Sequence, residues 1–169
     1  MGLDGENLIA EAGELMGLAF NFDEKTRRAI VIDKSTNMEY LIELPGNGSM
    51  LYVYTVLFKL ATEKDNGPFL YSLLELNLFG LQTNAATIGV DGKASTVVMH
   101  ISFPVEFLTP QLLVNLLSNF IVSSKKMREK IENLLITTNR ELRHRHVHFS
   151  AADSMGKERP KDRMRIIRI

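Results

Sequence analysis

The chain has 169 residues, with 20 Lys/Arg balanced by 20 Asp/Glu, and it contains no cysteine. This length fits one domain with a small additional element. The lack of cysteine excludes disulfides, thiolate metal sites and cysteine nucleophiles. No apolar run approaches the roughly 20 residues of a membrane-spanning helix, and no basic-then-apolar leader is seen, so neither a membrane anchor nor secretion is expected.

Charge is unevenly distributed along the chain. Residues 137–169 carry nine Lys/Arg and four Asp/Glu, a net charge of +5, whereas residues 1–136 carry 11 and 16, a net charge of −5. The pattern predicts an acidic body over 1–136 and a basic, flexible C-terminal tail over 137–169.

The body is predicted to begin with a helix. Leu8, Ala12 and Leu15 recur at helical spacing, Asp4 can cap the helix, and Gly17 can end it.

Three strands are predicted next. Segments 28–33, 38–44 and 50–57 show the period-two pattern of strands. The linkers between them, KSTN and PGNGS, are rich in turn-forming residues, so the three strands are expected to form an antiparallel meander.

A very apolar second helix is predicted over 66–79, with Pro68 near its start and Gly80 just past its end. Its apolar side chains form two neighbouring stripes. The first stripe is Phe69, Leu73 and Leu76, and the second is Leu70, Leu74 and Leu78. One stripe can cover the sheet, and the other needs a second cover.

Two strands and a long helix complete the body. The strands lie in 85–92 and 94–103 and are joined through Asp91-Gly92. Thr109 can cap the helix and Pro110 lies in its first turn. The order α-β-β-β-α-β-β-α, with neighbouring strands close in sequence, predicts an α+β fold, a five-stranded antiparallel twisted sheet with three helices.

The uncovered stripe of the second helix indicates a homodimer, because a two-fold interface can pair this helix with its own copy. The alternative is that the long C-terminal helix covers it within one chain. The residues expected at the dimer interface are Leu70, Leu73, Leu74, Asn77 and Leu78.

The sequence resembles the class I chaperones of bacterial type III secretion, the Tir chaperone family, over about residues 3–136. The resemblance rests on the helix containing LLELNLF, the hairpin ATIGVDGKASTVVMHISFP, and the helix that opens after FLT and closes with basic residues and Glu. FNFDE before the first strand and LYVYTVL in the third also match. The basic tail departs from the family pattern.

The resemblance implies a non-catalytic, homodimeric chaperone of the bacterial cytoplasm, without a cofactor. It would hold the N-terminal segment of one or more secreted effectors in extended form and present it to the secretion apparatus and its ATPase.

An unfolded segment can be held by adding a strand to a sheet edge and by filling apolar pockets beside it. Apolar side chains of the first helix, the following linker and the first two strands are the candidates for this surface, unless they form core. They are Leu8, Leu15, Phe20, Phe22, Ile30, Ile32, Met38, Tyr40 and Ile42.

Other chemistry finds little support. His144, His146 and His148 would share a face in a strand, but no cysteine completes a zinc site and the neighbouring Arg143 and Arg145 repel a cation, so no metal is expected. His100 is the only histidine of the body, and the serines lack a nucleophile-elbow context, so no enzyme is expected.

The rival function is a non-enzymatic binder of nucleic acid or acidic surfaces through the Arg-rich tail. The tail has almost no aromatic residues and its acids are interspersed, so sequence-specific reading of nucleic acid is not expected. A solubilising tail, or a tail that contacts the secretion machinery, are the other readings.

Overall fold

The computed structural model describes residues 4–18, 20–46, 48–61 and 66–153, and side chains as far as Thr137. It contains α1 (Gly5–Met16), β1 (Arg28–Asp33), β2 (Met38–Glu43), β3 (Met50–Lys59) and α2 (Gly67–Leu76). A 3₁₀ turn, η1 (Leu78–Gly80), precedes β4 (Thr87–Asp91) and β5 (Thr96–Pro104). A second turn, η2 (Val105–Phe107), precedes α3 (Pro110–Asp153).

The five strands form one antiparallel sheet in the order β1-β2-β3-β5-β4. The predicted fold class is therefore confirmed, including the meander of the first three strands and the separate β4–β5 hairpin. β1 and β4 are the two edge strands, which matters because an edge strand has backbone groups without a strand partner.

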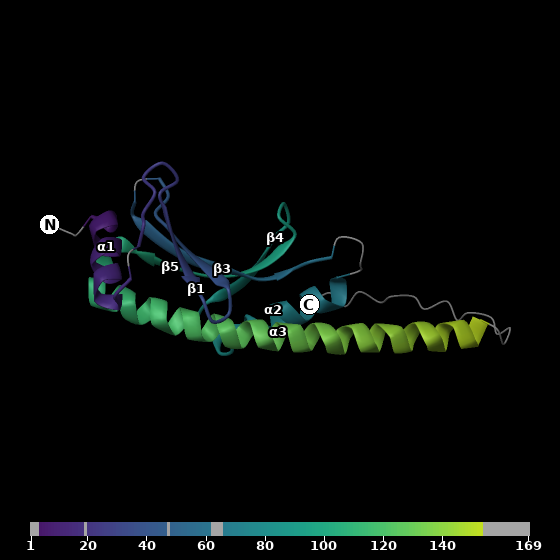
Figure 1. Ribbon diagram of the computed structural model, residues 1–169. Coiled ribbons are helices and arrows are strands. Elements are labelled where there is room, and N and C mark those ends of the chain that lie inside the picture. The colour runs from purple at the N-terminus through teal and green to yellow at the C-terminus, as the bar shows by residue number, and fades with distance from the viewer. Residues whose placement is uncertain (1–3, 19, 47, 62–65, 154–169) are drawn as a thin grey trace, which may run out of the picture. The chain divides into compact units, whose positions relative to one another are not determined.

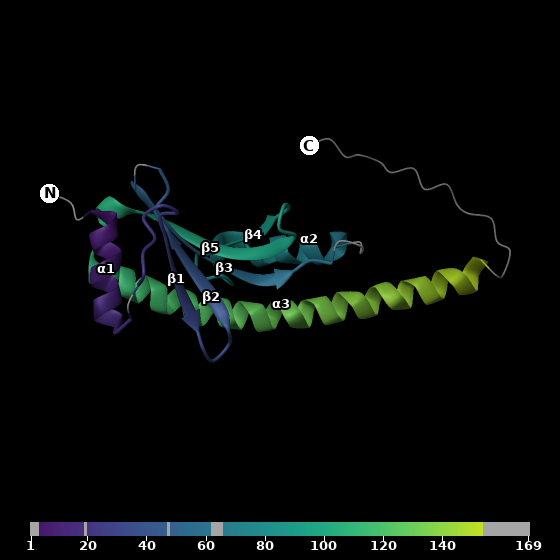
Figure 2. The ribbon, with the colours of Figure 1, turned by 45° about the horizontal axis from the view of Figure 1, so that its top comes forward.

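One face of the sheet carries the core, and α3 lies along it (Figures 1 and 2). Met38, Tyr40 and Ile42 of β2 and Leu51 and Val53 of β3 point to this face and are buried. They pack with buried apolar residues of α3, among them Leu113, Phe120, Met127 and Ile131. The ring of Tyr40 meets that of Phe120 edge-on, with the centroids 6.2 Å apart.

Two helix ends show the expected capping, whereas Asp4 precedes α1 without a capping hydrogen bond from its side chain. Gly17 ends α1 in the left-handed conformation, at φ 66°. At the start of α3, Thr109 Oγ1 accepts a hydrogen bond from the Leu112 N–H at 3.2 Å.

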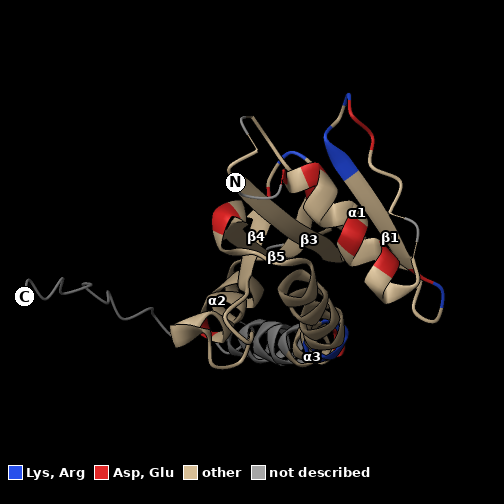
Figure 3. Ribbon diagram, turned by 90° about the vertical axis from the view of Figure 1, so that its left-hand side faces the viewer, with Lys and Arg blue, Asp and Glu red and all other residues tan. Residues whose placement is uncertain are grey.

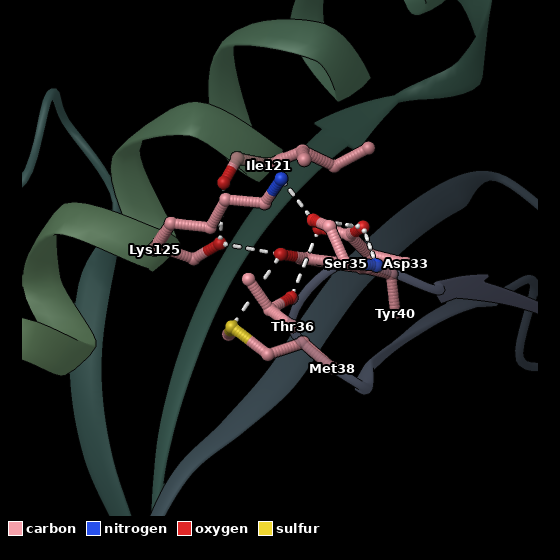
Figure 4. A network of polar contacts seen from close by, with 8 residues as sticks. Asp33, Ser35, Thr36, Met38, Tyr40, Ile121 and Lys125 are labelled. Atoms are coloured by element: carbon pink, nitrogen blue, oxygen red, sulfur yellow. Dashed lines mark hydrogen bonds and ion pairs between the residues drawn. The ribbon is translucent and has the colours of Figure 1, made fainter.

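A polar network attaches the β1–β2 hairpin to α3 (Figure 4). The carboxylate of Asp33 accepts hydrogen bonds from the Ser35 N–H at 2.9 Å and the Thr36 hydroxyl at 2.9 Å, and it forms an ion pair with Lys125 of α3. The hydrogen bond from Lys125 is the largest cause that holds the pKa of Asp33 below its ordinary value. Beside it, Ser124 Oγ lies 3.2 Å from Tyr40 Oη. The network fixes β1 on the core and thereby sets the position of the sheet edge.

The chain divides into two compact units, Met1–Leu135 and Ile136–Ile169. Helix α3 continues through the beginning of the basic tail to Asp153. The backbone at 144–148 is therefore helical, and alternate positions of a helix do not share a face. The arrangement considered for His144, His146 and His148, which requires a strand, does not apply to this backbone.

Candidate functional site

The outer edge of β1 has backbone groups free to accept another strand. The Leu44 N–H donates to the Arg27 carbonyl at 3.0 Å, so Arg27 and every second residue after it turn their backbone groups towards β2. The backbone N–H and C=O groups of Ile30 and Ile32 consequently point away from the sheet. Within the described residues no strand pairs with them.

The side chains of Ile30 and Ile32 are 52% and 53% exposed, and they lie on the sheet face opposite α3. Ile30 pairs with Leu41 and Ile32 with Glu39, so the two isoleucines share the face of those residues. A cavity of about 480 Å³ opens at this edge of the sheet, beside Ile30 and Leu41. Another cavity, of about 550 Å³, lies elsewhere in the molecule. An apolar surface therefore adjoins an unpaired strand edge.

Arg27 anchors α1 beside this edge. Its guanidinium donates to Glu6 of α1 at 2.7 Å and to the Leu44 carbonyl at 2.8 Å, and it lies 6.0 Å from the centroid of the Phe22 ring. Figure 3 shows α1 near β1, with acidic residues and no basic ones along the helix. Glu6 of α1 is thus held beside the start of β1.

A second polar group links β1, β2 and β3 on the sheet face opposite α3. Arg28 makes a bidentate pair with Glu43, at 2.9 and 3.2 Å, and the Tyr54 hydroxyl donates to the same carboxylate at 2.9 Å. Burial and this hydrogen bond raise the pKa of Tyr54 to about 12.

The sequence-predicted binding residues divide into two groups. Leu15, Ile30 and Ile32 are exposed, and Phe20 and Phe22 are half-buried against the core. The expectation of an uncovered surface is wrong for the other four, which are core residues: Leu8, Met38, Tyr40 and Ile42.

The register between β1 and β2 explains the correction for Met38, Tyr40 and Ile42. Ala29 pairs with Ile42 and Val31 with Tyr40, so these residues occupy the α3 side of the sheet. Ile30 and Ile32 are offset from them by one residue and occupy the other side. The exposed isoleucines of β1 therefore do not form one surface with Met38, Tyr40 and Ile42 of β2.

The residues expected at a dimer interface divide in the same way. Leu74 and Leu78 are 68% and 62% exposed, and Leu70 is half-buried. Leu73 is buried in the core, with the rest of the first stripe. The side chain of Asn77 accepts from the Ile88 N–H and donates to the Ile88 carbonyl, both at 2.8 Å. Leu73 and Asn77 thus already have partners within the chain.

Exposed apolar residues next to Leu74 and Leu78 enlarge this surface beyond the prediction. They are Tyr71, Phe79 and Leu81. Phe79 is 86% exposed and adopts φ 56°, because α2 ends at Leu76 and a 3₁₀ turn follows. Gly80 marks the end of the helix in the sequence, but no sequence signal showed that the helix stops three residues before Phe79.

No group of three His, Cys, Asp or Glu side chains that could hold a metal ion occurs in the described part of the chain. The side chains of His144, His146 and His148 lie outside it. None of the described helices is both long and apolar enough to span a membrane.

The family of the chain follows from comparison with known proteins. The model of the Tir chaperone protein (CesT) family matches residues 7–128, which include all five strands and the start of α3. The chain belongs to the Tir chaperone protein (CesT) family. The resemblance seen in the sequence is confirmed, and the basic tail lies outside the match.

Solved structures share the fold. A chain of the HopA1–SchA chaperone–effector complex is 17% identical with a TM-score of 0.59, over 73% of this chain and 92% of that one. A chain of the ExsC–ExsE complex is 15% identical with a TM-score of 0.59, over 76% and 96%. A chain of the complex between the Yersinia pestis type III secretion chaperone SycH and a stable fragment of YscM2 is 16% identical with a TM-score of 0.53. The match covers 72% of this chain and 98% of that one.

No curated protein sequence matches the chain significantly. The family match identifies the chain as a chaperone of the Tir chaperone protein (CesT) family, and the solved structures share its fold.

Proposed function

We propose that this chaperone holds the N-terminal segment of a secreted effector in extended form by adding it as a strand to the outer edge of β1. The observation that carries the proposal is the pair of unpaired backbone positions, Ile30 and Ile32. They lie at a cavity that is lined by Ile30 and Leu41 together with the polar residues Asn21, Asp23, Thr26 and Arg28. Main-chain hydrogen bonds give affinity that does not depend on sequence, and pockets for alternate side chains add specificity.

The apolar residues around this edge are the proposed contacts for effector side chains. Ile30 and Ile32 contact those that alternate onto the open face of the sheet. Leu15, Phe20 and Phe22 contact those that reach the α1 end. Phe20 packs on Gly13 of α1, where an added Cβ would lie 3.0 Å from the ring, so this part of the surface has little freedom to move.

The chaperone is further proposed to act as a homodimer through the exposed apolar surface of α2 and η1. Tyr71, Leu74 and Leu78 lie at helical spacing, and Phe79 and Leu81 continue the surface. Exposed patches of this kind commonly mark protein interfaces, and a two-fold axis would pair α2 with its copy.

The proposed role has no catalytic step and requires no cofactor. It places the chaperone in the bacterial cytoplasm, where an effector must be kept unfolded before export. Delivery to the secretion apparatus and contact with its ATPase are the proposed later steps.

The test is affinity capture from the native cytosol, with nuclease added, followed by mass spectrometry of the retained polypeptides. The Ile30→Lys/Ile32→Lys variant should lose the effector, because it places charge on the proposed surface without disturbing buried side chains. Val90→Lys is the matched control, since Val90 is a 50% exposed β-branched residue on the opposite edge strand. Retention of the same polypeptides by wild type and by the double variant would refute the β1 site.

A further inference from the structure

A groove of about 550 Å³ lies at the other end of the sheet from β1, between β5, α3 and the loop that leads into β4. Its lining includes His100–Phe103 of β5, Leu116, Asn119 and Phe120 of α3, and Thr83–Thr87. Among the described residues, no Asp, Glu, Lys or Arg side chain lines it. It combines apolar walls with short polar side chains.

The groove exists because β4 covers only part of β5. Pairing of β4 with β5 runs from Asp91↔Thr96 to Thr87↔His100, and β5 continues to Pro104. Before Thr87 the chain turns away from β5 through Asn84 and Ala85, at φ 52° and 63°. Asn84 donates to Ser123 Oγ of α3 at 2.7 Å, and Gln82 contacts Lys130, so the loop is attached to the helix instead of continuing the strand.

The backbone of Ser102 points into this uncovered space. The Val105 N–H donates to the Ser49 carbonyl, and the Leu60 N–H to the Ser95 carbonyl, so the odd-numbered residues of β5 turn their backbone groups towards β3. Even-numbered residues turn theirs towards β4. His100 meets Thr87 there, whereas Ser102 has no residue of β4 opposite it.

At the outer edge of β4, in contrast, the backbone groups of Ile88 already have hydrogen-bond partners. Asn77 bonds both backbone groups of Ile88, at 2.8 Å each, and so occupies the position that another strand would take. Within the described residues no side chain does this for Ser102. The fold thus covers the outer edge of β4 at Ile88 and leaves the end of β5 at Ser102 unpaired beside the groove.

We propose that this groove is a second polypeptide-binding site, at which a short, uncharged, extended segment of a partner protein pairs with β5 at Ser102. Alternate side chains of the segment would lie against Phe103, Leu116 and Phe120. The uncharged lining favours an uncharged segment, because a charged group would be desolvated there without a counter-charge. The site is separate from the β1 edge and does not depend on the function proposed for it.

The experiment uses the full-length Ile30→Lys/Ile32→Lys variant, in which the β1 surface is blocked. A phage-displayed library of random seven-residue peptides is selected on it, and the selected peptides are labelled and measured by fluorescence anisotropy. Ser102→Pro removes the N–H that faces the groove and leaves the bonds to β3 in place, because the donor at this position makes no bond to β3. Ser102→Ala keeps the N–H and is the matched control.

The proposal predicts uncharged peptides whose affinity falls at least tenfold in Ser102→Pro and stays unchanged in Ser102→Ala. A second readout avoids any folding defect of the proline variant: peptide binding should slow amide exchange of Ser102 at least tenfold in the parent variant. Failure to select peptides, equal affinity for the proline variant when it is folded, or an unchanged Ser102 exchange rate would overturn it.

Discussion

Asn77 connects α2 to the sheet through one side chain. Replacing it with alanine removes the donor and the acceptor that satisfy the Ile88 backbone. Because half-buried backbone groups are left unpaired, Asn77→Ala should lower the free energy of unfolding by about 1–3 kcal/mol. Urea unfolding measures this loss. Asn115→Ala, at an exposed residue that bonds only Gln111, is the control and should change stability little. A negligible effect of Asn77→Ala would show that the connection is unimportant.

Asp33 gives the fold a pH dependence with a definite sign. Its pKa is lowered in the folded chain, chiefly by Lys125, so its contribution to stability is present above the ordinary value of 3.8 and disappears as the pH falls through the lower folded value. Wild type should therefore be more stable than Asp33→Asn near neutral pH, and the difference should shrink as the pH falls below about 4. Thermal unfolding over this range tests the prediction. A difference that is constant with pH would contradict it.

At the residue scale, the sequence also could not show which apolar residues of β1 are buried. Both faces of β1 carry apolar residues, because Ala29 and Val31 face one side of the sheet and Ile30 and Ile32 face the other. Periodicity alone does not say which set is buried. Burial depends on the β1–β2 register and on the side that α3 covers, and neither is written in the local sequence.

At the scale of elements, α2 shows most clearly what could and what could not be predicted from the sequence. Its two apolar stripes could be read from the sequence, and the stripe of Phe69, Leu73 and Leu76 does cover the core. The sequence could not show that Leu73 is buried in the core of the same chain, or that Asn77 is hydrogen-bonded to Ile88, because these partners lie on other elements. It also could not show the early end of the helix, which exposes Phe79 through a local change of backbone conformation.

Neighbouring leucines of α2 should consequently respond differently to substitution. Leu73→Ala removes a side chain buried to 97% and should cost about 2–5 kcal/mol of unfolding free energy. Leu74→Glu lies at an exposed position, so the monomer should remain folded while the proposed dimer dissociates.

Light scattering and thermal unfolding of these variants separate the two effects. Phe107→Glu, at an exposed aromatic residue of η2, controls for the loss of surface apolar area. A Leu74→Glu protein that keeps a dimeric mass would exclude α2 as the interface, and one that unfolds would show that Leu74 belongs to the core.

At the scale of the whole molecule, the chaperone body and the basic tail are separable in the proposed account. The family match ends at residue 128 and the first compact unit ends at Leu135. A chain of residues 1–136 should therefore keep the thermal midpoint and the effector affinity of the full chain. Calorimetry and capture test this. Loss of the bound polypeptide upon removal of the tail, with the fold intact, would assign effector binding to the tail.

The central claim is that the effector adds a strand to β1. Its most direct measurement is residue-resolved amide exchange of the chaperone, alone and with the N-terminal segment of the captured effector. The account predicts that the Ile30 and Ile32 amides, which point outward, exchange quickly in the free protein and become strongly protected in the complex. Unchanged exchange at both positions in a saturated complex would contradict it and place the effector elsewhere on the molecule.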